Sequence, residues 1–492
     1  MKNLIIVFHL LICSSLAYGA NSSNPLQLES RTFKSASGKE VKAEVGSFIV
    51  PENRSNLNSA EIPIHFIRLK STNPNPQTPI FYLEGGPGSS SSWQAQNPRY
   101  LEGWTHFLAL GDVILLDQRG TGEGRDRVSF FSPKKLPENI LIDKEVSRNH
   151  FKTMRENALK SFKERGVDLN GYTTVENAND IDALRKALGY KKISLLGFSY
   201  GTHLGQTYIK YYEDHVENAV LIGVEGLNHT YKLPSTMDTQ LRKIALLANA
   251  DANVNQDVPD LIALYQRVVK KLNDAPAQVE VNSPVTRQPM KIKINAEGLN
   301  MLLRFDIGDA SDIPVFPRLL YSIDQGDYKM LKWFVQKRIG NYYGINGMSA
   351  TMDAASGATA DRLQRIKEEE KKSWFGDVVN LGMGNGWPTP DLGDEFRAPL
   401  TTDVRTLFLS GTLDFNTPPY QAEEVRWGFS NSSHIIVNYA GHEQILFHPK
   451  AIPTIIRFFS GEDVNDVALS YPKLRFIPVK GETGKLSHGS LR

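Results

Sequence analysis

Residues 193–212 read ISLLGFSYGTHLGQTYIKYY, a short apolar run followed by a helical pattern. The run 193–196 is typical of a strand buried on both faces, and 200–212 predicts a helix. Between them, GFSYG at 197–201 matches the G-x-S-x-G motif, in which a sharp strand-to-helix turn lifts a serine hydroxyl clear of a sheet. Ser199 is therefore the candidate nucleophile, and the alternative is a serine that merely occupies a tight turn.

Similar apolar runs without alternation occur along the chain, and each predicts a buried strand. They lie at 80–83, 113–116, 219–222, 407–409 and 435–437. Residues 41–50 and 62–70 alternate instead, which predicts an antiparallel entry into the same sheet. Helical patterns such as 178–188 separate the runs, so the predicted fold class is α/β, with a mostly parallel, doubly wound sheet. Its ligand site is expected beyond the carboxyl ends of the strands.

The strand and helix rhythm stops between 227 and 400, where amphipathic helical stretches dominate, including 259–272 and 313–333. We predict that 227–400 is an inserted helical cap. The sheet-containing core is then made by 21–226 and 401–465, and 466–492 forms a C-terminal tail. Composition rich in Gly, Ala, Ser or Pro predicts mobile or irregular connections within the cap at 344–358 and 382–393.

The composition argues against several classes of protein. The chain has 492 residues, of which 40% are hydrophobic and 22% charged, as in ordinary globular proteins. Its 56 basic and 54 acidic residues leave a formal charge of +2. Because that charge is too small to drive binding by counterion release, we expect no nucleic-acid partner.

The first residues have the pattern of a secretory signal, because an apolar stretch at 4–17 follows Lys2 and precedes small residues. We predict that 1–20 is a cleaved signal peptide and that the protein is secreted or periplasmic, without stable membrane insertion. A membrane anchor and a lipidated Cys13 are the less favoured alternatives. Loss of Cys13, the single cysteine, would exclude disulfides, thiolate nucleophiles and cysteine-bound metals.

A serine hydroxyl needs a base within hydrogen-bond reach and a carboxylate that holds the tautomer of that base. Asp414 follows the predicted strand 407–409 and His442 follows 435–437, so both lie at the edge of the sheet where Ser199 lies. The order Ser, Asp, His is that of hydrolases with the G-x-S-x-G turn. A turn-capping role for Asp414 and the competing histidines His434 and His448 are the alternatives.

The loop EGGPG at 84–88 follows the predicted strand 80–83, where such hydrolases place a donor of the oxyanion hole. We expect one backbone amide from Gly85 or Gly86 and a second from Tyr200 to bind the oxyanion. Each donor contributes about 3 kcal/mol to stabilising the transition state. The alternative is a plain glycine turn.

GGPG at 85–88, DQRGTG at 117–122 and GFSYG at 197–201 together resemble the prolyl aminopeptidase and tripeptidyl aminopeptidase family of α/β-hydrolases. The resemblance covers most of 45–460 and includes GTLD at 411–414. It implies release of an N-terminal proline or a short N-terminal peptide, with the free amine of the substrate anchored by acidic residues near the cap. Glu84 stands where cytosolic prolyl enzymes commonly have histidine, which favours the secreted tripeptidyl type.

Three further charged residues lie at the same edge. Glu225 follows the predicted strand 219–222 where the cap begins, so it is the candidate amine anchor. A salt bridge inside the protein is an equally favoured role for Glu225. Asp117 and Arg119 close the predicted strand 113–116, and an ion pair that braces the turn is favoured over contact with substrate.

The sequence thus predicts a secreted serine exopeptidase that acts through an acyl-enzyme formed on Ser199. Its partners are peptides with a free N-terminus, and it requires neither a metal nor an organic cofactor. A cap over the catalytic edge favours an exopeptidase because it limits access to chain ends. A carboxylesterase or small-ester hydrolase with the same triad is the first alternative. A catalytically inactive hydrolase fold used as a binding module is the second, and the oligomeric state is left open.

Overall fold

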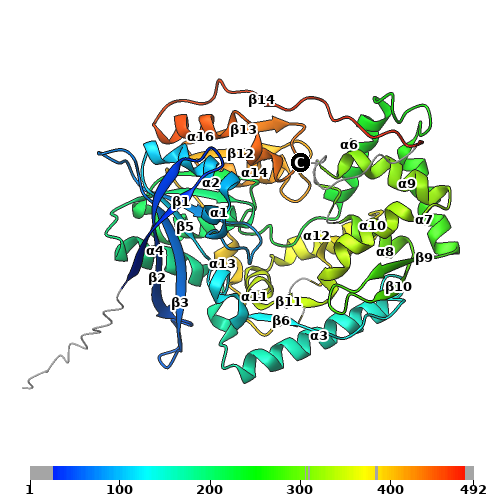
Figure 1. The fold of residues 1–492 in the computed structure, drawn as a ribbon, viewed down its shortest axis with the longest axis horizontal. Helices are drawn as coiled ribbons and strands as arrows, with labels where there is room; N and C mark the ends of the chain where they lie inside the picture. Colours follow the sequence, from blue (N-terminus) through cyan, green and yellow to red (C-terminus); the bar gives the residue numbers. More distant parts are fainter. Residues whose placement is uncertain (1–25, 305, 309–310, 383–385, 482–492) are drawn as a thin grey trace, which may run out of the picture.

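The computed structural model describes residues 26–304, 306–308, 311–382 and 386–481, and Figure 1 shows their arrangement. The predicted signal peptide, 1–20, and Cys13 lie outside the described residues. Within the described ranges, no helix combines the length and the apolar character that crossing a bilayer requires.

A ten-stranded sheet forms the centre of the core, in the order β1-β2-β3-β5-β4-β7-β8-β12-β13-β14. Strands β1 to β3 are antiparallel, and every pairing from β5 to β14 is parallel. The predicted, mostly parallel sheet is therefore confirmed. The strands are β1 (Gln27–Lys34), β2 (Glu40–Pro51), β3 (Glu61–Leu69), β4 (Ile80–Leu83), β5 (Val113–Leu116), β7 (Ile193–Phe198), β8 (Val216–Ile222), β12 (Arg405–Gly411), β13 (Ser432–Asn438) and β14 (Leu469–Ser470).

Helices cover both faces of this sheet, which explains why its central strands are apolar throughout. On one face lie α4 (Thr174–Ala187) and α5 (Tyr200–Tyr212), which pack through Ile181, Leu204 and Tyr208. On the other face lie α2 (Pro98–Thr105) and α16 (Ala451–Phe459). The chain between β12 and β13 carries α14 (Pro419–Arg426), and the loops that leave the carboxyl ends of the strands meet at one edge.

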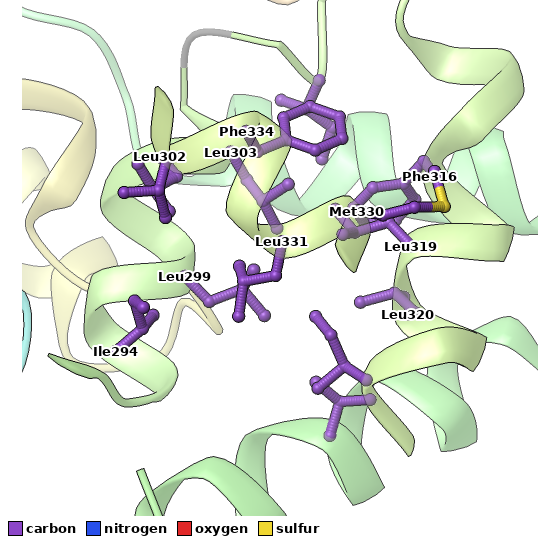
Figure 2. Packing of buried hydrophobic residues seen from close by; sticks show 14 of the residues in the cluster. Ile294, Leu299, Leu302, Leu303, Phe316, Leu319, Leu320, Met330, Leu331 and Phe334 are labelled. Atoms are coloured by element: carbon purple, nitrogen blue, oxygen red, sulfur yellow. The ribbon is translucent and has the colours of Figure 1, made fainter. Parts of the chain in front are cut away.

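Most of the elements between β8 and β12 form a second layer at the right of Figure 1, while α11 (Gly347–Ser356) and α13 (Gly393–Arg397) lie nearer the core strands. Its apolar interior is shown in Figure 2, where Leu299, Leu319 and Leu331 from three helices lie close together. The helices are α6 (Ser235–Asn249), α7 (Leu261–Asp274), α8 (Ala296–Leu303), α9 (Phe316–Asp324), α10 (Lys329–Arg338), α11 (Gly347–Ser356), α12 (Ala360–Glu370) and α13 (Gly393–Arg397). We refer to this layer as the cap.

The sequence pattern predicted a helical cap, but the cap also contains strands. It contains an antiparallel hairpin of β9 (Ala277–Asn282) and β10 (Pro289–Ile294), whose residues alternate between exposed and buried. Segments from outside 227–400 also join it. The strand β6 (Ser129–Phe131) pairs with β11 (Gly344–Asn346), and residues 474–479 of the predicted tail pack against the cap interior.

The predicted helical stretch 313–333 divides into two helices, because α9 ends before Gly326, which has φ of 80°, and α10 begins at Lys329. One prediction about a cap segment is wrong. The stretch 344–358 is not an irregular connection, because it forms β11 and α11. Asn346 caps α11 by accepting a hydrogen bond from the Ser349 amide at 3.2 Å. These local stop and start signals outweigh the small-residue composition.

Candidate active site

Ser199 lies at the sharp turn between β7 and α5 and has φ of 55° and ψ of −124°. The turn is held because the Ser199 amide donates to the Ile222 carbonyl at 2.8 Å. Both motif glycines are required by close approach of the backbone. A Cβ on Gly201 would lie 1.9 Å from the Leu83 oxygen, and one on Gly197 would lie 2.6 Å from the Gly201 oxygen. The sequence therefore places the Ser199 hydroxyl at the end of the strand, at the start of a helix.

The structure brings the three predicted side chains of the triad together. The Ser199 Oγ lies 2.8 Å from His442 Nε2, and His442 Nδ1 lies 2.7 Å from Asp414 Oδ2. Asp414 follows β12 and His442 follows β13, so neighbouring parallel strands deliver them to one edge. This geometry is that of a hydroxyl with a base in reach and a carboxylate behind the base.

Thr417, which the sequence did not single out, also contacts the Asp414 carboxylate. Its hydroxyl donates to Asp414 Oδ2 at 2.6 Å and its amide donates to Oδ1 at 3.0 Å. Burial raises the pKa of Asp414, but the His442 charge and these hydrogen bonds outweigh burial and hold the pKa below its ordinary value. The carboxylate therefore stays ionised beside the imidazole at neutral pH.

Burial and the carboxylate act on His442 in opposite directions. Burial lowers the pKa of His442, whereas the Asp414 charge and hydrogen bond raise it, and the net pKa lies above the ordinary value. The competing histidines have other partners. His434 Nε2 lies 3.0 Å from Ser410 Oγ, and His448 Nε2 lies 3.3 Å from the Ser470 oxygen. Of these three histidines, His442 is the one hydrogen-bonded to the Ser199 hydroxyl.

One of the predicted oxyanion donors already has a partner. The Gly85 amide donates to Glu84 Oε1 at 3.0 Å, and the same carboxylate is held by Tyr82 and by Gln94. Burial raises the pKa of Glu84, while these three donors lower it. Of the two amides predicted for this loop, that of Gly86 makes no hydrogen bond with a described residue, and its role as a donor stays a prediction.

The second predicted donor is the amide of Tyr200, the first residue of α5. An amide in the first turn of a helix has no carbonyl partner within the helix, and the positive end of the helix dipole reinforces it. A Cβ on Gly85 would lie 3.0 Å from Ser199 Cβ, so the glycine loop and the serine are in contact. The glycine loop therefore lies beside Ser199, and Tyr200 directly follows Ser199 in the chain.

Asp117 braces the segment that follows the glycine loop. It accepts hydrogen bonds from the amides of Ser91 and Ser92 at 2.7 and 2.8 Å, and from the Ser92 hydroxyl at 2.8 Å. Arg119 instead binds both carboxylate oxygens of Asp180 at 2.8 Å. The predicted ion pair between Asp117 and Arg119 is wrong, because each side chain holds a different segment.

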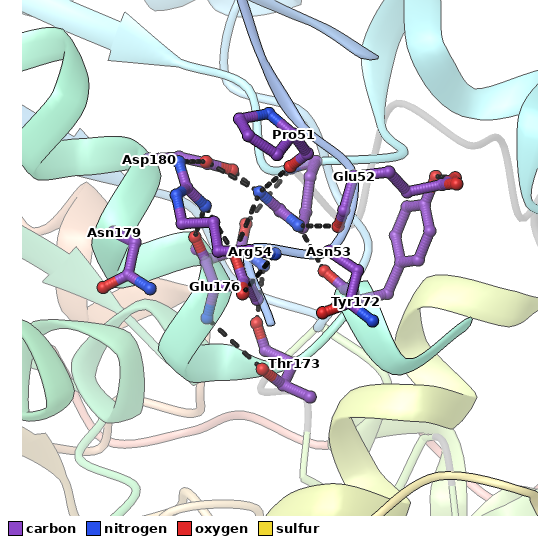
Figure 3. A network of polar contacts seen from close by, with 12 residues as sticks. Pro51, Glu52, Asn53, Arg54, Tyr172, Thr173, Glu176, Asn179 and Asp180 are labelled. Atoms are coloured by element: carbon purple, nitrogen blue, oxygen red, sulfur yellow. Dashed lines mark hydrogen bonds and ion pairs between the residues drawn. The ribbon is translucent and has the colours of Figure 1, made fainter. Parts of the chain in front are cut away.

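Figure 3 shows a polar network around Arg54 and Asp180, and Arg119 joins this network through its hydrogen bonds to Asp180. Arg54 contacts Asp180 at 2.6 Å and Glu176 at 2.5 Å, so two guanidinium groups share the acidic side of α4. Arg119 Nη1 also donates to the backbone oxygen of Glu52 at 2.6 Å. Paired, hydrogen-bonded charges of this kind are expected at buried positions, and they fix the end of β2 to α4. Arg119 therefore has a structural role.

The structure gives Glu225 an internal partner and adds a residue that sequence reasoning missed. Glu225 Oε2 lies 2.6 Å from Lys232 Nζ, which is the salt bridge among the two alternatives. The missed residue is Asp353 on α11, whose carboxylate has no hydrogen bond or ion pair with any described residue. Burial and the Glu225 charge raise the pKa of Asp353 to about 7, although Lys232 lowers it. The sequence feature that could have indicated Asp353 is a single acidic residue within an Ala-rich stretch.

The chain belongs to the α/β-hydrolase fold family, whose family model matches residues 78–449. The predicted fold class is thereby confirmed. The chain is similar to the tripeptidyl aminopeptidase of Streptomyces lividans, with 27% identity over 60% of this chain and 51% of the relative. It is also similar to the serine protease Hip1 of Mycobacterium tuberculosis, with 40% identity over 24% of each chain. The resemblance seen in the sequence motifs is confirmed.

The chain spans about half the length of the tripeptidyl aminopeptidases that it matches. Among solved structures, it is similar to a proline iminopeptidase-related protein from Thermus thermophilus. That match has 14% identity and a TM-score of 0.36, and it covers 88% of this chain and 98% of the other.

Proposed function

We propose that the protein is a secreted serine exopeptidase that releases N-terminal proline or short N-terminal peptides. The observation that carries the proposal is the unbroken contact from Ser199 through His442 to Asp414, at 2.8 and 2.7 Å. The names of the relatives, a tripeptidyl aminopeptidase and a serine protease, support peptides as the substrate class.

In the proposed reaction, Ser199 Oγ attacks the scissile carbonyl carbon while His442 Nε2 takes the hydroxyl proton. The carbonyl oxygen becomes an oxyanion and accepts hydrogen bonds from the amides of Gly86 and Tyr200. His442 then gives its proton to the leaving amine, and the C–N bond breaks to leave an ester on Ser199. Water attacks this ester with His442 again as base, and the acid product leaves as the serine hydroxyl is restored. Asp414 holds the imidazole in the tautomer that each step needs.

We propose that Asp353 and Glu225 together recognise the free amine of the substrate. The Glu225 carboxylate is already paired with Lys232, so Asp353 is the acidic group left to pair with an ammonium. A substrate ammonium would lower the pKa of Asp353 and supply the missing ion-pair partner. An acetylated N-terminus carries no such charge, so recognition of this kind makes the enzyme an aminopeptidase.

Secretion is part of the proposal and rests on the signal-like sequence of residues 1–20. Mass spectrometry of the protein exported by a bacterial host would test it, since a cleaved signal leaves an N-terminus near residue 21. An exported chain that keeps Met1, or a chain found only in the cytosol, would contradict this part.

The peptidase activity is tested with a mixture of peptides that have free or acetylated N-termini. Mass spectrometry of the products should show amino acids or short peptides released from the free N-termini alone. The Ser199→Ala variant serves as the matched control and should leave both sets intact. Turnover of simple esters while both peptide sets stay intact would contradict the peptidase and support an esterase.

A further inference from the structure

The cap helix α11 contacts the two segments that carry the proposed oxyanion donors. At its beginning, the Ser349 hydroxyl donates to the Pro87 oxygen, and Asn346 Nδ2 donates to the Gly88 oxygen at 3.4 Å. At its end, Ser356 Oγ lies 3.2 Å from Nε2 of His203, a buried residue of α5. The helix therefore bridges the glycine loop and the helix that follows Ser199.

The contact between α11 and the loop leaves no free space. A Cβ on Gly88 would lie 2.3 Å from Ser349 Oγ and 2.4 Å from Asn346 Nδ2. Gly88 also has φ of 101°, which side chains rarely adopt. The absence of a side chain at position 88 thus lets the two cap residues reach the backbone of the loop.

The glycine loop is fixed at its two ends by the core. Glu84 holds the Gly85 amide at the start, and Asp117 holds Ser91 and Ser92 at the end. Between these points, the carbonyl oxygens of Pro87 and Gly88 accept hydrogen bonds within the described part of the chain. Both hydrogen bonds come from the beginning of α11. The orientation of the Gly86 amide, which lies directly before this stretch, therefore depends on α11.

We propose that Asn346 and Ser349 are positioning residues of the oxyanion hole. By holding the carbonyls of Pro87 and Gly88, they aim the Gly86 amide at the reacting carbonyl oxygen, so catalysis depends on the placement of α11. An oxyanion donor is effective only when it is already oriented before charge develops. This inference rests on the proposed serine hydrolase chemistry. It assigns to Asn346 and Ser349 an effect on the catalytic rate and none on substrate affinity.

Asn346 allows a substitution that separates this role from a structural one. Its Oδ1 caps α11 through the Ser349 amide, and its Nδ2 donates to Gly88. The Asn346→Asp variant keeps an acceptor for the cap and removes the donor toward the loop. A carboxylate also suits a helix N-terminus, so the variant should retain its fold.

Asn295 provides a matched control in the same cap. Its Oδ1 caps α8 by accepting from the Gly298 amide at 2.9 Å, and its Nδ2 donates to the Ile142 oxygen at 3.1 Å. The Asn295→Asp variant therefore makes the same chemical change at a helix cap that does not contact the glycine loop. We expect it to keep the wild-type kcat and KM.

The test compares kcat, KM and the rate at which a fluorophosphonate acylates the nucleophile in both variants. We expect Asn346→Asp to lower kcat and the acylation rate by about tenfold, less than the 10²–10³-fold loss typical of removing a donor itself. KM should stay within about twofold, because a misaligned oxyanion donor weakens binding of the transition state more than binding of the substrate. Ser349→Ala removes the second donor without adding charge and should give a loss of the same kind.

An active wild type with unchanged kcat in both Asn346→Asp and Ser349→Ala would overturn the inference and leave the proposed function standing. Equal losses in Asn346→Asp and Asn295→Asp, or a change confined to KM, would also overturn it. A wild type that reacts with neither peptides nor the fluorophosphonate would refute the proposed function as well. If Asn346→Asp fails to fold, Ser349→Ala decides the matter alone.

Discussion

At the scale of single residues, the pKa of His442 determines when the proposed base is available. The imidazole must be neutral to accept the Ser199 proton, and its pKa lies above the ordinary value because Asp414 outweighs burial. We therefore expect kcat/KM to rise with pH through an acid limb whose midpoint lies above 6.5. A pH profile on a substrate without titratable groups measures this midpoint.

The Asp414→Asn variant is the control for this prediction. It removes the charge that raises the His442 pKa, so the midpoint should move to lower pH, and kcat should fall by about 10⁴-fold because the tautomer is no longer held. An acid limb that lies below 6.5 in the wild type, or one that does not move in the variant, would contradict the assigned roles.

We expect Asp353 to favour binding of the substrate amine and to lower the free energy of unfolding at neutral pH. Its pKa of about 7 lies above the ordinary 3.8, so the folded chain holds a proton that the unfolded chain releases as pH rises from about 4 to 7. Stability is therefore lost across this window, and Asp353→Asn should unfold less readily above pH 7. Each pKa unit corresponds to ~1.4 kcal/mol. We expect the gain in the free energy of unfolding to be about 1–3 kcal/mol, less than the whole pKa shift would give, because the residue is partly exposed.

The same variant should raise KM for peptides with a free amine by at least about tenfold, the equivalent of one lost ion pair of about 1.4 kcal/mol. Turnover of a simple ester should be unchanged, because the triad is intact. Urea unfolding at pH 8 and pH 4, together with peptide and ester kinetics, measures both effects. The exposed Asp361 on α12 supplies the control, and Asp353→Asn values equal to those of Asp361→Asn would contradict the assignment.

Sequence reasoning went furthest for residues whose position follows from a motif. Ser199, Asp414 and His442 could be placed together because parallel strands end at one edge and each residue closely follows a strand. The partner of Gly85 and the salt bridge of Glu225 depend on side chains that the fold brings in from elsewhere. No local pattern encodes such contacts.

At the scale of elements, buried strands were predictable and amphipathic or small-residue segments were less so. The strand β1 is exposed along nearly its whole length and therefore lacks the alternation that marks a half-buried strand. The helix α11 was missed because Gly, Ala and Ser dominate its sequence, although Asn346 at its start and Gly357 at its end are ordinary helix boundaries. This helix carries Asp353 and contacts the glycine loop, so the error concealed part of the site.

At the scale of the whole molecule, the core supplies the triad and the cap supplies what the triad lacks. Core loops carry Ser199, His442 and Asp414, whose side chains contact one another. The cap contributes Asp353 beside Glu225, and it contacts Gly88 through Asn346. The insertion between β8 and β12 therefore relates to both substrate choice and rate in the proposed enzyme.

Peptide mapping after reaction with a fluorophosphonate tests directly whether Ser199 is the nucleophile. We expect a single covalent adduct on the Ser199 hydroxyl, no adduct in Ser199→Ala, and much slower labelling when His442 is replaced by alanine. An adduct on another residue, or peptide hydrolysis by Ser199→Ala at the wild-type rate, would contradict this assignment.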